Sequence, residues 1–91
     1  MNDVKLVTYD LNREVIRPKI VEAIKKLGSG WARLSESSYA IADGGTVEQV
    51  YGKLKPLLDN NDYLYVVTLK KPWTGFGLKK VNEWVESNLT H

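Results

Sequence analysis

The chain begins with a β-prone apolar run that ends abruptly in a carboxylate. The run covers residues 4–9, Asp10 follows it, and a helical pattern starts a few residues later. In that pattern the apolar side chains recur at helical spacing, at Ile16, Ile20, Ala23, Ile24 and Leu27. The order predicts a strand followed by a helix, with one acidic side chain at the tip of the strand.

Two residues mark the ends of this first helix. Pro18 lies in the first turn, where its missing N–H costs little. Gly28 is expected to close the helix as a C-terminal glycine.

Residues 31–42 are too many for one strand, and the polar run 35–38 lies in their middle. We expect two strand pieces, 31–35 and 37–42, joined by a bulge or a tight turn. Residues 43–45 then form a turn.

The second helix has the clearest pattern. Thr46 is its N-cap, and Gln49 stands three residues on, at capping-box spacing. One apolar stripe follows, made of Val47, Val50, Tyr51, Leu54, Leu57 and Leu58. Pro56 removes a backbone donor and is expected to distort the last turn.

Residues 63–69 are predicted to form the last strand, which is apolar on both faces. Tyr63, Tyr65, Val67 and Leu69 lie on one face, and Leu64 and Val66 on the other. Such a strand is covered on both sides. The second cover is either the C-terminal tail or another subunit, and we favour a subunit interface supported by the tail.

The tail consists of an aromatic loop at residues 73–77 and a third helix. The apolar residues of that helix are Leu78, Val81, Trp84, Val85 and Leu89. The whole order is β-α-β-β-α-β plus a C-terminal helix, which predicts an α+β, ferredoxin-like fold with an antiparallel sheet and two helices on one face. We expect a single domain over residues 1–91, with its core at about 3–70 and the loop and helix at 71–91.

Composition narrows the class of protein. The chain has 91 residues, a net charge of +2 and no cysteine, which excludes disulfides and thiolate metal sites. No stretch approaches the ~20 apolar residues that span a bilayer, and the N-terminus has no apolar core long enough for a signal peptide. We expect a cytoplasmic protein with no membrane partner.

Three stretches resemble a known family. They are residues 7–12 (Val-Thr-Tyr-Asp-Leu-Asn), 36–39 (Glu-Ser-Ser-Tyr) and 57–62 (Leu-Leu-Asp-Asn-Asn-Asp). They are similar to the small CRISPR-associated proteins of the Cas-two family and, more closely, to their SinR-like relatives in bacterial and mobile-element genomes. The VapD toxins look like more distant cousins. The resemblance covers about the first three-quarters of the chain.

The resemblance implies a homodimer in which the aspartate that ends the first strand approaches its twin. By position, Asp10 matches that aspartate, and Ser38 and Tyr39 match a small polar residue and an aromatic after the bulge. Some members of the family are metal-dependent nucleases, and others are non-catalytic parts of a DNA-integration complex. This chain departs from the family in its few arginines at the first helix and in its tail, which replaces a short exchanged strand.

Asp10 is the leading candidate for a chemical site. It could ligate Mg²⁺ or Mn²⁺ with oxygen atoms, and the metal would activate a water for attack on a phosphodiester. The alternative is a strand-end aspartate that caps the next helix or pairs with Arg13 or Arg17. Glu36 is either a second acid or a solvated side chain.

The other acids and the histidine have simpler interpretations. Asp59 and Asp62 are explained by turn chemistry. His91 is the last residue of the sequence, and we assign it no role.

Five residues are candidates for binding RNA or DNA: Arg13, Arg17, Lys70, Lys71 and Trp73. Two interpretations of the aromatic loop stay open, because it either offers a stacking platform or tucks its rings over the core.

Two classes of function remain at this stage. The first is a non-catalytic homodimeric module, Cas-two-like, that binds nucleic acid or protein. The second is a metal-dependent endonuclease that uses Asp10 at the dimer interface. We favour the first, because one carboxylate without a neighbouring acid or base provides few groups for catalysis.

Overall fold

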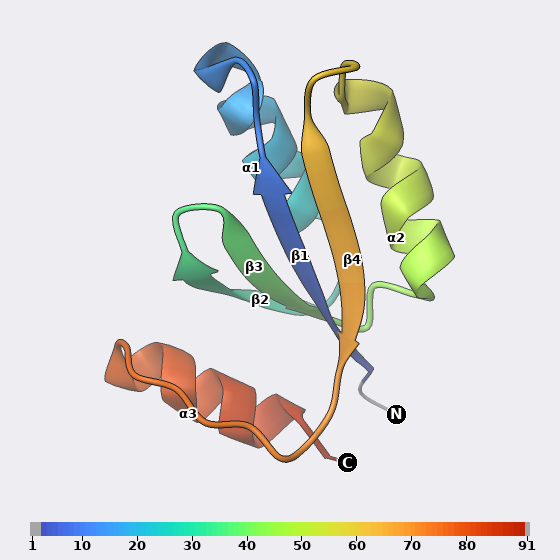
Figure 1. Cartoon of the computed structure of the whole chain (residues 1–91). Helices are drawn as coiled ribbons and strands as arrows, with labels where there is room; N and C mark the ends of the chain where they lie inside the picture. Colours follow the sequence, from blue (N-terminus) through green and yellow to red (C-terminus); the bar gives the residue numbers. More distant parts are fainter. Residues whose placement is uncertain (1–2, 91) are drawn as a thin grey trace.

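The computed structural model describes residues 3–90 of the chain. His91 lies outside the described residues. The four strands form one sheet, which Figure 1 shows with two helices behind it and a third crossing its lower end.

The strands are β1 (Val4–Asp10), β2 (Gly30–Ser35), β3 (Ser38–Ala42) and β4 (Tyr63–Leu69). Their order across the sheet is β2-β3-β1-β4, and every neighbouring pair is antiparallel. The order confirms the ferredoxin-like arrangement, because each crossover helix carries the chain past the strand between the two that it connects. It also makes β2 and β4 the two edge strands.

Helix α1 (Arg17–Lys25) follows a 3₁₀ turn, η1 (Glu14–Ile16), and α2 (Val47–Leu54) runs into a second one, η2 (Lys55–Leu57). The tail forms α3 (Lys79–Asn88). Helices α1 and α2 pack on one face of the sheet, which we call the covered face. Its core contains Val7, Tyr9, Leu11, Ile20, Ile24, Tyr39, Ile41, Val50, Leu54 and Leu64.

Both ends of α2 are as the sequence predicts. The Thr46 Oγ1 accepts from the backbone N–H of Gln49 at 3.1 Å, and the Gln49 Oε1 accepts from the N–H of Thr46 at 2.9 Å. This reciprocal pair is a capping box, which satisfies two donors at the helix start. Pro56 ends the α-helix at Leu54, and the next residues tighten into η2.

Gly28 does not close helix α1 as the C-terminal glycine that the sequence predicted, and the reason for glycine here is different. Helix α1 ends at Lys25, and Gly28 does not adopt a left-handed conformation there. A Cβ at Gly28 would collide with the carbonyl oxygen of Ala42. Glycine is required at this position because the chain leaving α1 runs tightly against the end of β3, where the N–H of Ser29 donates to the same carbonyl at 2.9 Å.

The bulge expected in the middle of the β2–β3 hairpin is present. The pairing register shifts between Arg33 and Ser35, and the chain turns before β3 begins at Ser38. An extra residue in one strand bends it and raises its twist.

The second face of the sheet, which we call the open face, is covered only in part. Helix α3 packs over one end of it, where Val85 and Leu89 join Val4 and Ala40 in a small second core. Within one chain the tail therefore covers β4 only at one end, and cover by a second subunit stays a prediction. Tyr63, Tyr65 and Val67 on this face expose 60%, 64% and 49% of their surface. The tail helix does not reach them, because it crosses the opposite end of the strands (Figure 1).

Candidate functional site

Asp10 ends β1 on the open face of the sheet. Side chains alternate along a strand, and Val7 and Tyr9 enter the covered core, so Asp10 shares the other face with Leu6 and Thr8. Its partner across the β1–β4 ladder is Tyr63, and both residues are exposed. The carboxylate therefore lies at the rim of the open face, as the sequence predicts.

Asp10 caps neither of the helical turns that follow β1. The N-caps of η1 and α1 have no side-chain hydrogen bond, and the two arginines that we considered as partners contact other acids. Arg13 lies 3.8 Å from Asp59, and Arg17 lies 2.6 Å from Glu14. The helix-capping alternative for Asp10 is thus not what the structure shows.

Within residues 3–90, no group of three or more acids or histidines is arranged to hold a metal ion. The nearest polar pair on the open face of β1 is Thr8 with Ser38, whose hydroxyl oxygens are 3.0 Å apart. A single carboxylate binds Mg²⁺ weakly, because the ion demands several oxygen ligands in octahedral geometry. A second carboxylate from another subunit is needed to make Asp10 a metal site.

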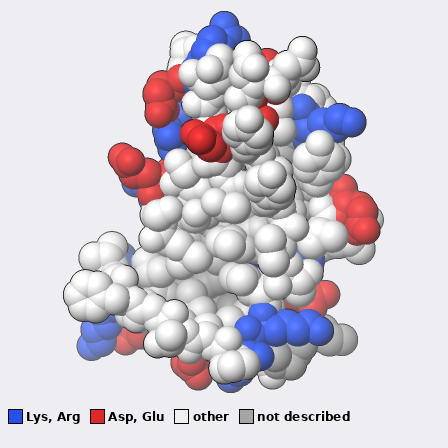
Figure 2. Space-filling model, viewed as in Figure 1, with Lys and Arg blue, Asp and Glu red and all other residues white. Residues whose placement is uncertain are grey.

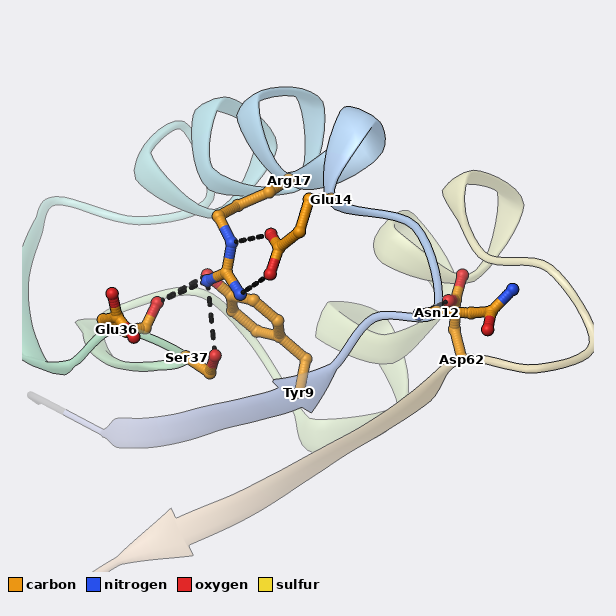
Figure 3. Close-up of polar contacts among 7 residues, drawn as sticks. All are labelled: Tyr9, Asn12, Glu14, Arg17, Glu36, Ser37 and Asp62. Carbon is orange, nitrogen blue, oxygen red and sulfur yellow. Dashed lines mark hydrogen bonds and ion pairs between the residues drawn. The ribbon is translucent and has the colours of Figure 1, made fainter.

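Arg17 has a structural role that the sequence analysis did not assign. Its guanidinium donates to both carboxylate oxygens of Glu14, to the backbone oxygen of Glu36 at 2.7 Å and to the Ser37 hydroxyl at 3.2 Å (Figure 3). The same guanidinium lies 5.5 Å from the centre of the Tyr9 ring. These contacts connect the start of α1 to the β2–β3 turn, and they occupy most of the N–H donors of the Arg17 guanidinium.

The charges in this network shift the pKa of each partner. The hydrogen bonds to Arg17 hold the pKa of Glu14 below its ordinary value, and Glu14 in turn raises the pKa of Arg17. Burial raises the pKa of the Tyr9 hydroxyl, which donates to the Glu36 carbonyl at 3.3 Å. All three groups keep their usual charge at neutral pH, so the network holds structure and supplies no general base.

Asp62 organises the turn before β4. Its two carboxylate oxygens accept from the backbone N–H groups of Asn12 at 2.7 Å and Asp59 at 2.9 Å (Figure 3 labels Asn12 and Asp62). These two bonds hold its pKa below its ordinary value. Asp59 in turn accepts from the N–H of Asn61 at 2.9 Å. Turn chemistry is confirmed for both aspartates.

The five residues predicted to bind nucleic acid lie at two opposite ends of the sheet. Arg13 and Arg17 follow the end of β1, whereas Lys70, Lys71 and Trp73 follow the end of β4, and β1 and β4 are antiparallel. One positively charged patch therefore does not contain all five. Lys71 lies 3.8 Å from Glu86, and the Trp73 indole N–H donates to Glu86 at 3.1 Å.

Each of the two interpretations of the aromatic loop, a stacking platform or rings packed over the core, fits one of its two rings. Trp73 is partly buried against the small core under α3. Phe76 exposes its whole side chain, at 106% of its reference surface. The loop therefore tucks one ring in and presents the other to solvent.

A groove of about 1040 Å³ runs beside this loop. Its walls are the β2–β3 turn, the loop and α3, and it is lined mainly by apolar side chains, among them Leu34, Leu69, Trp73, Phe76, Leu78 and Val81. Figure 2 shows this side of the molecule, where the middle carries no Lys, Arg, Asp or Glu and the charges lie around the margin. The sequence signalled the apolar residues of β4 but not this groove, because the groove depends on where α3 docks.

No protein-family model and no curated protein matches the sequence. A solved structure with a similar fold is that of a hypothetical protein from Thermus thermophilus. It aligns with a TM-score of 0.66 and 21% identity over 86% of this chain and 94% of that one. A likeness at this level of identity establishes the fold and nothing about activity.

No helix within residues 3–90 is long and apolar enough to cross a bilayer. The cytoplasmic location expected from the sequence stays a prediction.

Proposed function

We propose that the chain is a non-catalytic homodimeric module, of the kind its resemblance to Cas-two and SinR-like proteins implies, and that it binds protein rather than nucleic acid. The observation that carries the proposal is the open face, whose middle carries no charged side chain (Figure 2). Exposed Tyr63, Tyr65 and Val67 form one part of it, and the groove beside Phe76 forms the other. Contiguous exposed apolar surface of this kind marks interaction sites for proteins.

The ion pairs of the candidate nucleic-acid-binding residues favour a protein over a nucleic acid as the partner. Arg13, Arg17 and Lys71 each lie within ion-pair distance of an acidic side chain. A nucleic acid is bound chiefly through cations that are available to neutralise phosphates. Three of the four candidate cations are thus compensated within the protomer.

The second candidate function is a metal-dependent endonuclease with Mg²⁺ or Mn²⁺ on Asp10. One observation favours it: the carboxylate is exposed on the rim of the open face, where a second subunit could add another. We rank it second because, within residues 3–90, no group of three or more acids or histidines is arranged to hold a metal ion.

The test measures oligomeric state and nucleic-acid binding on the same preparation. We expect a dimer by sedimentation, and neither cleavage nor tight binding of labelled RNA or DNA with Mg²⁺, Mn²⁺ or chelator. Cleavage that Asp10→Asn abolishes would replace the proposal with the nuclease. Salt-dependent binding without cleavage would make the module a nucleic-acid binder instead. Glu83→Gln removes one exposed carboxylate on α3 and is therefore the matched control for Asp10→Asn.

A further inference from the structure

The two edges of the sheet differ in how they are protected. An edge strand presents a row of N–H and C=O groups without ladder partners, and natural proteins blunt such edges with charges, bulges or cover. At β2 two of these devices are present: Arg33 is exposed, and the register shifts between Arg33 and Ser35.

Strand β4 has neither a charge nor a bulge, although α2 contacts it. Its sequence, Tyr-Leu-Tyr-Val-Val-Thr-Leu, contains no charge and no proline, and its pairing with β1 runs without a register shift over 7 residues. No described strand pairs with its outer side, as Figure 1 shows. An uncharged edge of this length, without a bulge and without a neighbouring strand among the described residues, is a template for another strand.

We propose that β4 pairs antiparallel with β4 of a second copy of this chain, with Val66 on the twofold axis. The inference rests on the proposed homodimer and names the surface that forms it. A twofold contact of this kind is isologous, because the same strand is used by both copies. It joins the two sheets into one continuous sheet.

Charge fixes the register. Asp62 and Lys70 are the first charges on either side of the strand, and each lies four positions from Val66. Antiparallel pairing about Val66 therefore places Lys70 of each copy opposite Asp62 of the other. A shift of two positions would place Lys70 opposite Asn60 or Leu64 instead, and a shift of one would turn the exposed tyrosines to the wrong face.

The Asp62 carboxylate can accept this additional contact. It uses one lone pair of each oxygen for the N–H groups of Asn12 and Asp59, and a carboxylate has about four acceptor positions. Lys70 is exposed and directly follows β4, so its ammonium can reach across the seam.

The same register pairs the exposed side chains of the open face. Tyr65 lies opposite Val67 of the second copy, and Tyr63 lies opposite Leu69. Aromatic side chains beside β-branched or aliphatic ones are among the favourable cross-strand pairs. The pairing thus brings the side chains that α3 leaves exposed side by side across the seam and extends the apolar part of the open face over both copies.

Edge pairing also separates the two Asp10 carboxylates. Asp10 lies beside Tyr63, one strand in from the seam. Three strand spacings across the sheet and about six residues along it put the two Asp10 positions roughly 25 Å apart. They cannot share one metal ion, which agrees with the non-catalytic proposal, and this dimer differs from the one that the resemblance implies, in which the two aspartates approach each other.

Engineered cysteines test the register, because the chain has none of its own. Val66→Cys faces its own twin and should form a disulfide-linked dimer on mild oxidation, seen on a non-reducing gel. Tyr65→Cys and Val67→Cys should each cross-link about tenfold more slowly alone than when the two variants are mixed, because each faces the other position. The mixture keeps the test valid if Val66→Cys does not fold.

A charge variant gives an independent readout. Lys70→Glu puts like charges opposite each other at both ends of the seam and should weaken dimerisation by about tenfold or more in low salt. Lys19→Glu on α1 makes the same charge change away from the seam and should leave the dimerisation constant unchanged.

The outcomes separate this inference from the proposed function. A dimer in which Tyr65→Cys links to itself and Val66→Cys does not would overturn edge pairing and leave the homodimer standing. A dimer that Lys70→Glu does not weaken would overturn the register. A wild-type chain that stays monomeric at every concentration in sedimentation would overturn both.

Discussion

Both faces of the sheet carry apolar side chains, but the two faces end in different states. The covered face has two helices over it, and Ile20, Ile24, Val50 and Leu54 there are fully buried. The open face has one short helix over one end, and its β4 side chains stay exposed. The difference indicates that the covered face stabilises the protomer and that the open face, with the β4 edge beside it, is available for association.

The largest effect on the free energy of unfolding is expected when a side chain in the core of the covered face is shortened. Ile24→Ala should lower the free energy of unfolding by about 3–4 kcal/mol, because the buried side chain leaves a cavity that neighbours fill only in part. Chemical denaturation at a fixed low protein concentration measures the change. A loss under about 1 kcal/mol would mean that this face is not the main core.

The next largest effect is expected under α3. Leu89 is 3% exposed and packs in the small second core. Leu89→Ala should lower the free energy of unfolding by about 2 kcal/mol, at the low end for a buried leucine because the site can collapse toward the open groove. A loss equal to that of Ile24→Ala would contradict the unequal roles of the two faces.

A smaller effect on the protomer is expected on the exposed part of the open face. Tyr65→Thr keeps a residue suited to a strand and should change the unfolding free energy of the monomer by less than about 0.5 kcal/mol. Its dimerisation, measured by sedimentation, should weaken clearly. Glu83→Gln, on the outside of α3, should alter neither quantity.

The smallest effect concerns acid pH. The folded pKa values of Glu14 and Asp62 lie below their ordinary values of 4.5 and 3.8, because each carboxylate accepts hydrogen bonds in the native state. Their contribution is complete above those ordinary values and is lost as the pH falls through the folded pKa. Both groups are exposed, so we expect a shallow decline in unfolding free energy below about pH 4.5.

The variant Glu14→Gln should flatten that decline, and the exposed Glu48→Gln on α2 serves as its control. An unchanged pH profile in Glu14→Gln would mean that the ion pair with Arg17 contributes nothing in solution.

Local signals in the sequence were enough for most of the elements. The capping box at Thr46 and Gln49, the effect of Pro56 and the bond from Asp59 to Asp62 are all short-range, because each involves backbone groups within a few residues. The bond from Asn12 to Asp62 is not, because these residues lie fifty positions apart. The position of Asp10 at a strand tip followed from the same local order. The role of Gly28 did not, because the carbonyl that excludes a side chain there comes from β3.

The candidate site was predicted less completely than the fold. The sequence predicted that four basic residues bind nucleic acid together: Arg13, Arg17, Lys70 and Lys71. Because β1 and β4 are antiparallel, the two arginines and the two lysines lie at opposite ends of the sheet. The sequence could not show that Arg17 binds the β2–β3 turn, since Glu36 and Ser37 are about twenty positions away. Pairing over such distances depends on how the elements pack.

The sequence by itself determined the periodic elements, their order and the acidic tip of β1, because hydrophobic period and capping act within a helix or strand. Only the tertiary structure decided which apolar residues are buried. Tyr65 and Leu64 are neighbours in one strand, yet one is exposed and the other is in the core. The physical reason is that burial requires a covering element, and α3 reaches only the Leu69 end of β4 and not Tyr65.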